Sequence, residues 1–329
     1  MNWEALWYGP RAVGYSLLVA CLLPASGVYW LVTWLWHGLF DWGVRRPVRV
    51  VGATVVSVGN LVAGGAGKTP VVMYLARLAQ EQGAKVAVLS RGYGRRSKAP
   101  RHFSSAELPP VEEVGDEPRL IARACPGVEV WVGADRVASA KAAVALGATV
   151  LILDDGFQHR RLHRDVDILV DGGEGNGWVL PAGPLREPRG GRRRATLIWG
   201  RDGVAGDVEA RYVVEKVRRP NGTLVELASL AGRAVVVLTA VARPQRVRAT
   251  LEGAGARVVG LHAFPDHHVF TAEEVARVKA NATEHMAVMV TTEKDAERLS
   301  VPVHVLVQEV QVTKGAGRLP SLGATPPAG

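Results

Sequence analysis

Residues 50–69 read VVGATVVSVGNLVAGGAGKT, an apolar run that leads directly into a glycine-rich loop ending in Lys-Thr. The run Val50–Val58 predicts a buried strand, because β-branched residues favour the extended backbone of a sheet. Residues 69–82 carry apolar side chains at helical spacing, so a helix follows the loop. The stretch therefore predicts a strand, a glycine-rich loop and a helix, and this order decides the fold class.

A loop in this setting is typical of nucleotide phosphate binding. Gly64, Gly65 and Gly67 let backbone N–H groups turn toward phosphate oxygens, and the following helix adds its positive end. Lys68 supplies a charge for the β- and γ-phosphates, and the Thr69 hydroxyl is placed for Mg²⁺. The strict pattern begins with glycine, but here that position is valine, and a purely structural turn is the alternative. The predicted ATP-binding residues are Val62, Ala63, Gly64, Gly65, Ala66, Gly67, Lys68 and Thr69.

Strands and helices alternate along most of the remaining chain, which predicts parallel sheets covered by helices. The fold class is therefore α/β: a P-loop NTPase-like parallel sheet domain with a smaller second α/β domain. A β-hairpin linker signalled by Asn221-Gly222 joins them, and a membrane-associated helix precedes them. The expected parts are 1–48 (N-terminal membrane segment), 49–205 (P-loop domain), 206–230 (linker), 231–312 (smaller domain) and 313–329 (disordered tail).

Two aspartates follow the apolar run Thr149–Leu153. Asp154 and Asp155 therefore fall at the carboxyl edge of the predicted sheet, where α/β proteins bind their ligands. A carboxylate at this place can hold Mg²⁺ or its water shell, although capping of the next turn is the alternative.

The N-terminal segment runs from Ala12 to Phe40 without a charged residue. About 20 such residues suffice to span a bilayer core. Six of the nine tryptophans fall within the first 42 residues, as expected at a membrane interface. Pro24 permits either one kinked span or a broken helix in the interface. Arginines directly after the segment place the rest of the chain in the cytoplasm. A cleaved export signal and a buried soluble helix are the alternatives.

Composition restricts the partners further. Lys and Arg number 40 against 31 Asp and Glu, a net charge of +9, which favours anionic ligands or an anionic membrane. Two cysteines cannot form a disulfide framework or a four-ligand zinc site. A nucleic-acid partner is not expected, because no recognition motif or aromatic stacking platform follows the N-terminal segment.

Six further motifs occur in a fixed order behind the membrane segment. They are SRGYGR (90–95), GDEP (115–118), LDDGFQH (153–159), LPAGPLREP (180–188), FPDHH (264–268) and TTEKDA (291–296). Together they closely resemble the tetraacyldisaccharide 4′-kinase family of lipid A biosynthesis, from about residue 10 to 312. One departure is Thr239–Pro244, where the family usually has a Gly-Ile-Ala/Gly-Asn-Pro-like stretch.

The resemblance implies transfer of the ATP γ-phosphate to the 4′-hydroxyl of a tetraacylated glucosamine disaccharide 1-phosphate. Its catalytic pair maps to Asp116, as general base, and His267, which would orient Asp116. A plain helix cap and a structural loop histidine are the respective alternatives. Glu117 and Asp155 are candidate Mg²⁺ ligands together with Thr69.

The resemblance also implies partners and a location. These are the lipid A disaccharide 1-phosphate precursor and membrane lipids of the cytoplasmic leaflet of the bacterial inner membrane, with no obligate protein partner. The alternative is a membrane-bound positioning or partition ATPase, whose loop reads KGGxGKT. Ala63 stands where that signature requires lysine.

Overall fold

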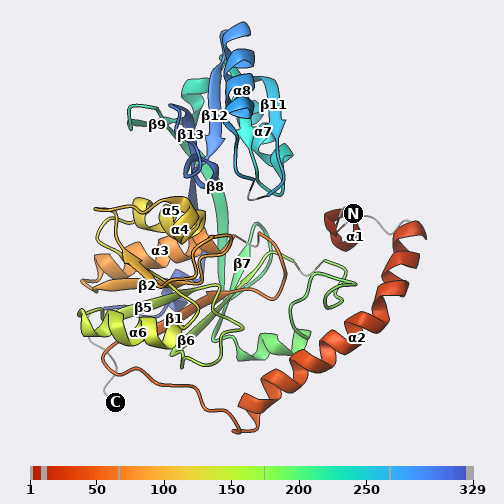
Figure 1. Ribbon diagram of the computed structural model, residues 1–329, viewed down its shortest axis with the longest axis vertical. Helices are drawn as coiled ribbons and strands as arrows, with labels where there is room; N and C mark the ends of the chain where they lie inside the picture. Colours follow the sequence, from red (N-terminus) through yellow and green to blue (C-terminus); the bar gives the residue numbers. More distant parts are fainter. Residues whose placement is uncertain (1–2, 9–12, 66, 174, 267, 324–329) are drawn as a thin grey trace. The chain divides into compact units, whose positions relative to one another are not determined.

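The computed structural model describes residues 3–8, 13–65, 67–173, 175–266 and 268–323, which fold into two compact units (Figure 1). The first unit comprises Met1–Arg91, Gly127–Arg211 and Val312–Gly329. The second comprises Gly92–Pro126 and Tyr212–Gln311. Each unit has its own group of parallel strands and its own apolar core, so each is described separately.

The first unit is built on a parallel sheet with the strand order β7-β6-β1-β5-β2-β4. Every residue of β2 and β5 is buried, because helices α3 (Lys68–Glu81) and α6 (Arg136–Ala145) cover opposite faces (Figure 1). This confirms the predicted P-loop α/β domain. The strands are β1 (Thr54–Gly59), β2 (Val86–Ser90), β4 (Glu129–Val132), β5 (Val150–Asp154), β6 (Val166–Asp171) and β7 (Leu197–Arg201).

The second unit contains a smaller parallel sheet, in which β10 (Ala234–Thr239) lies between β11 (Arg257–Ala263) and β12 (Val288–Thr292). Strand β13 (His304–Lys314) continues this sheet beside β12. Helices α7 (Pro244–Gly253) and α8 (Ala272–Glu284) pack against it. The α/β rhythm predicted for this part of the chain is thus confirmed.

The expected hairpin is also present. Strand β8 (Val208–Arg218) pairs antiparallel with β9 (Leu224–Glu226). Between them Gly222 has a φ of 85°, a backbone conformation that glycine adopts without strain. Strands β8 and β13 both begin in one unit and end in the other, so the chain passes between the units along these two strands.

One segment falls outside the expected domain division. Residues 92–126, expected within the P-loop domain, group with the second unit and carry β3 (Arg101–Phe103), α4 (Val111–Val114) and α5 (Asp116–Ala124). The physical reason is ionic: Arg119 and Arg123 of α5 both bind the buried carboxylate of Glu297, at 2.9 and 2.6 Å. Glu297 follows the short helix α9 (Glu293–Ala296).

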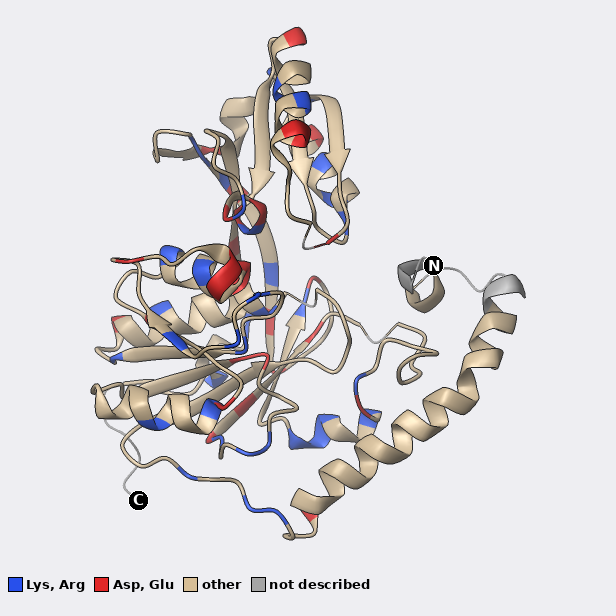
Figure 2. Cartoon of the chain, in the orientation of Figure 1, with Lys and Arg blue, Asp and Glu red and all other residues tan. Residues whose placement is uncertain are grey.

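The N-terminal part holds α1 (Trp3–Tyr8) and the long helix α2 (Val13–Asp41). Helix α2 continues through Pro24, so the broken-helix alternative is not observed. Within the described residues, Ser16–Asp41 is long and apolar enough to cross a membrane, with a mean hydropathy of 1.7. Figure 2 shows α2 without charge colour over nearly its whole length.

Residues 313–323, expected to be part of a disordered tail, are ordered instead. Strand β13 extends to Lys314, and a 3₁₀ turn, η3 (Ala316–Arg318), follows it. Leu322 is fully buried, and its backbone N–H donates to Gln82 Oε1 at 2.7 Å. These contacts order residues 313–323, and residues 324–329 lie outside the described part of the chain.

Candidate active site

The glycine-rich loop leaves the carboxyl end of β1 and enters α3. Gly64 and Gly67 have φ angles of 98° and 76°, which only glycine adopts readily. A Cβ atom added at Gly64 or Gly65 would meet no atom within 4 Å, so this side of the loop is open to a ligand. Ala66, one of the predicted binding residues, lies outside the described residues.

Lys68 is held by two oxygens of neighbouring elements. Its Nζ donates to Asn60 Oδ1 at 3.1 Å and lies 3.3 Å from Asp155 Oδ1. Asn60 is fully buried, and its Nδ2 donates to the backbone oxygen of Val62 at 2.8 Å. Asn60 therefore fixes both the first residue of the loop and the lysine near its end, a role that the sequence analysis did not identify.

The two aspartates after β5 have different surroundings. Asp154 is buried, and its Oδ2 accepts a hydrogen bond from Ser90 Oγ at 3.1 Å. Asp155 has a φ of 54°, which turns its side chain toward Lys68 and Arg186. Burial raises the pKa of the Asp155 carboxyl, but Lys68 and Arg186 outweigh it and hold that pKa below its usual value. Asp155 is thus ionised at neutral pH beside the phosphate loop.

The motif LPAGPLREP contributes two charged residues to the same place. Arg186 Nη1 contacts both carboxylate oxygens of Asp155, at 2.9 and 2.8 Å. Glu187 is buried and accepts from Gln158 Nε2 at 2.8 Å and from Arg194 Nη2 at 2.6 Å. Gln158 also donates to the backbone oxygen of Asn60 at 2.9 Å. Arg186, Glu187 and Gln158 therefore surround the base of the phosphate loop.

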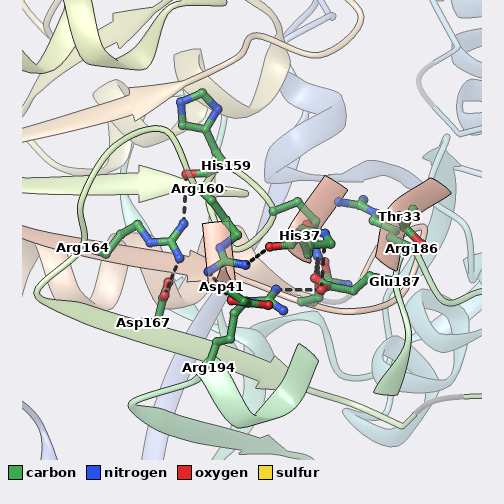
Figure 3. A network of polar contacts seen from close by, with 12 residues as sticks. Thr33, His37, Asp41, His159, Arg160, Arg164, Asp167, Arg186, Glu187 and Arg194 are labelled. Carbon is green, nitrogen blue, oxygen red and sulfur yellow. Dashed lines mark hydrogen bonds and ion pairs between the residues drawn. The ribbon is translucent and has the colours of Figure 1, made fainter. Parts of the chain in front are cut away.

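Helix α2 contacts this arrangement directly. Tyr29 donates from its hydroxyl to the backbone oxygen of Arg186 at 2.8 Å, and His37 Nε2 lies 3.5 Å from Glu187 Oε2. Figure 3 shows His37 and Glu187 together with Arg194 in one polar network. The apolar N-terminal helix is therefore bound to the loop that carries Arg186, the ion-pair partner of Asp155.

A basic cluster continues the network away from the loop. Arg160 binds the backbone oxygen of His37 and the carboxylate of Asp41 at the end of α2, at 2.9 and 2.6 Å (Figure 3). Arg164 donates to Asp167 Oδ2 at 2.8 Å. The side chains of both arginines are thus engaged by groups of the protein itself.

The candidate base, Asp116, is the first residue of α5 in the second unit. Its side chain is 5% exposed, its Oδ1 accepts from the backbone N–H of Glu117 at 2.9 Å, and its Oδ2 lies 3.3 Å from Arg298 Nη2. Glu117 Oε1 lies 3.5 Å from Lys294 Nζ. His267, the other half of the predicted pair, lies outside the described residues.

The oxygen donors present fit a magnesium ion. Thr69 is the second residue of α3, directly after Lys68, and the Asp155 carboxylate lies 3.3 Å from the Lys68 amine in the same unit. No cluster of three or more acidic, His or Cys side chains occurs in the part of the chain that the structure describes. Mg²⁺ needs none, since it commonly takes one or two protein oxygens, phosphate oxygens and water. Glu117 lies in the second unit, where its carboxylate contacts Lys294.

Comparison with known proteins agrees with this geometry. The sequence model described as tetraacyldisaccharide-1-P 4′-kinase matches residues 18–319. The chain belongs to the tetraacyldisaccharide-1-P 4′-kinase family. A relative named tetraacyldisaccharide 4′-kinase, from Anaeromyxobacter sp. (strain Fw109-5), is 42% identical over 90% of this chain and 87% of its own length. Another with this name, from Rhodospirillum centenum, is 40% identical over 95% of this chain and 92% of its own.

A solved structure gives the same result at the level of the fold. LpxK from Aquifex aeolicus, crystallised in complex with ATP, superposes with a TM-score of 0.74 and 32% identity. The alignment covers 92% of this chain and 97% of that one. The tetraacyldisaccharide-1-P 4′-kinase family is one of lipid kinases, so the resemblance stated from the motifs is confirmed. The positioning-ATPase alternative is not favoured.

Proposed function

We propose that this chain transfers the γ-phosphate of ATP to the 4′-hydroxyl of a tetraacylated glucosamine disaccharide 1-phosphate. One observation carries the proposal above the others: Lys68, Asp155 and Arg186 form a connected set beside an open glycine-rich loop, in a chain that belongs to a lipid kinase family. Such a set can bind and neutralise a triphosphate, which is most of what phosphoryl transfer requires of a protein.

Each side chain has a defined part in the reaction. Lys68 binds the β- and γ-phosphate oxygens, and Arg186 shares the charge that develops during transfer. Asp116 accepts the proton of the 4′-hydroxyl, and His267 orients Asp116. The bond between the sugar oxygen and the γ-phosphorus forms while the bond from that phosphorus to the ADP oxygen breaks.

Magnesium belongs to the proposal as the ion that neutralises the phosphates. Thr69 and Asp155 would hold it, with Glu117 as a third candidate ligand. Bound there, Mg²⁺ supplies charge stabilisation for the transferred group. Asp155 keeps its negative charge for this purpose, because Lys68 and Arg186 lower its pKa.

The proposed location is the cytoplasmic face of the bacterial inner membrane. The stripe of α2 with Ser26, Tyr29 and His37 contacts the 179–187 loop. Large apolar residues on its other side, including Val28, Leu31 and Leu35, are exposed. The helix can therefore lie along the bilayer surface with its apolar side in lipid while its polar stripe stays on the protein. Proposed partners are this lipid substrate and the membrane lipids of that leaflet.

The test is lipid phosphorylation by the purified full-length chain with γ-labelled ATP. We expect label on the lipid only when Mg²⁺ and the disaccharide 1-phosphate are both present. Lys68→Ala should weaken ATP binding and transfer together, whereas Asp116→Asn should reduce transfer to a small residual rate and leave ATP binding nearly unchanged. Near-normal turnover by Asp116→Asn would show that Asp116 is not the general base.

A further inference from the structure

We propose that Lys294 and Arg298 are positioning residues, which together hold Asp116 and the two neighbours of residue 267 in one fixed arrangement. They belong to residues 293–298, Glu-Lys-Asp-Ala-Glu-Arg, hereafter the clamp segment. The inference rests on the proposed function, because it concerns the residues that would accept and orient the substrate proton. It assigns a role to the motif at residues 291–296, which takes no part in the proposed chemistry of the phosphate loop.

Arg298 joins three separate parts of the second unit. Its side chain is 4% exposed, and its Nη2 contacts Asp295 Oδ1 at 2.9 Å and Asp116 Oδ2 at 3.3 Å. Its Nη1 donates to the backbone oxygen of His268 at 2.7 Å. One guanidinium therefore fixes the proposed base and the residue that directly follows position 267. A planar guanidinium suits this task, because its donors diverge in a rigid fork.

Lys294 makes a second connection of the same kind, between a neighbour of Asp116 and a neighbour of position 267. Its Nζ lies 3.5 Å from Glu117 Oε1 and 3.3 Å from Asp266 Oδ1. Burial lowers the pKa of Lys294, but Glu117, Asp116 and Asp266 outweigh it and raise that pKa, so the amine is charged. Lys294 thus links the residue after Asp116 to the residue before position 267.

The clamp segment is itself anchored to the sheet. Asp295 is fully buried, and its Oδ2 accepts from Thr239 Oγ1 at 2.8 Å and from the backbone N–H of Ala240 at 3.1 Å. Both partners lie at the carboxyl end of β10. Because this anchor fixes the backbone of the segment, the fold sets the directions in which the Lys294 and Arg298 side chains extend.

Neighbouring ion pairs of the same segment provide a control. Glu293 is 8% exposed at its side chain and pairs with Arg218 of β8 at 3.2 Å. This pair also attaches the clamp segment through a buried carboxylate, although Arg218 is 29% exposed and Arg298 only 4%, and it joins the segment to β8 instead of Asp116 and residues 266–268. Removing it tests whether any ionic attachment of the clamp segment has the same effect on turnover.

The experiment measures steady-state lipid phosphorylation and thermal stability of the full-length chain carrying Arg298→Met, Arg298→Lys, Lys294→Met or Arg218→Met. For Arg298→Met we expect kcat to fall about tenfold to a hundredfold, because small misplacements at a reacting centre have effects of this size. The KM for ATP should stay within about twofold of the original. Methylguanidinium added to Arg298→Met should restore part of kcat. Lys294→Met should show the same pattern more weakly, and Arg218→Met should keep kcat.

A double-mutant comparison separates this inference from the proposed function. If Arg298 acts through Asp116, then Arg298→Lys should slow the original chain but have no further effect in Asp116→Asn. Full activity of Asp116→Asn would overturn the proposed base, and with it this inference. An inactive Asp116→Asn with undiminished kcat in both Arg298→Lys and Lys294→Met would overturn the clamp alone. Equal loss of kcat in Arg218→Met and Arg298→Met would also overturn it, as a purely structural role predicts.

Discussion

The Nη1 atom of Arg186 lies 2.9 and 2.8 Å from the two carboxylate oxygens of Asp155. Since Asp155 also contacts Lys68, its carboxylate lies between two cationic side chains beside the phosphate loop. The single negative charge of Asp155 offsets one of their two positive charges. A bound triphosphate would offer oxygens to both cations, and the Asp155 carboxylate would then be available to hold a metal ion.

Replacing Arg186 should therefore reduce transfer more than it reduces folding. We expect Arg186→Met to lower kcat/KM for ATP at least tenfold, because a cation aimed at the transferred group is lost. Its melting temperature should change little, since the residue is partly exposed. Arg248→Met, which removes an exposed ion pair on α7, is the control and should have full activity. Equal activity of the two variants would contradict the role of Arg186.

Asn60 should matter for ATP affinity. Asn60→Ala removes the acceptor of Lys68 and the donor to Val62, and leaves the Val62 oxygen without its buried partner. A lost buried partner typically costs about 1–3 kcal/mol. We expect the Kd for ATP, measured by calorimetry, to rise about tenfold or more, with a lower melting temperature. Unchanged affinity would show that the position of Lys68 does not depend on Asn60.

Tyr29 should connect the membrane helix to turnover. Tyr29→Phe removes only the hydroxyl that holds the Arg186 backbone, at a net cost of about 1 kcal/mol. We expect a severalfold lower kcat/KM in detergent with vesicle binding unchanged. Trp34→Ala, on the exposed side of α2, should show the reverse: weaker vesicle binding and normal turnover in detergent. Normal turnover in Tyr29→Phe would separate the helix from catalysis.

His159 should make the first unit sensitive to acid. Burial, together with Arg136, Arg164 and Arg161, lowers its pKa to about 4 from an ordinary 6.5. The unfolded chain therefore binds a proton between pH 6.5 and 4 that the folded chain excludes. Stability from this residue is complete above pH 6.5 and is lost as the pH falls toward 4.

Denaturant unfolding at pH 7 and pH 5 checks this effect. Between these values His159 should account for at most about 2 kcal/mol of lost stability. His159→Asn should reduce the difference between the two pH values. An identical difference in both chains would show that other groups cause the acid sensitivity.

The sequence predicted the parts of the fold that depend on local pattern. Strand β1, the glycine-rich loop and α3 follow from β-branching, glycine and helical spacing, and the structure contains all three. It did not predict β7 or the extension of β13, because their burial depends on strands far away in the chain. The grouping of residues 92–126 with the second unit depends on Glu297, which is more than 170 residues away from Arg119 and Arg123.

Candidate site residues were predicted where a motif carries its own chemistry, as for Lys68 and Asp155, or where the family resemblance implies a role, as for Asp116, and these roles stay predictions. Asn60, Gln158 and Glu187 were not among them. Their roles arise from contacts across the sheet edge, such as Gln158 with both the Asn60 backbone and Glu187. The only sequence signal was that two of the three lie inside motifs of the family, Gln158 in LDDGFQH and Glu187 in LPAGPLREP.

The central claim is that this chain phosphorylates a lipid-linked sugar, and the most direct test determines where the phosphate is placed. The full-length chain is incubated with γ-labelled ATP, Mg²⁺ and the tetraacylated disaccharide 1-phosphate, and the product is analysed by mass spectrometry and NMR. The account predicts one added phosphate at the 4′-oxygen, and far less of this product from Lys68→Ala or Asp116→Asn. ATP hydrolysis without any lipid-dependent transfer, or a phosphate at another hydroxyl, would contradict it.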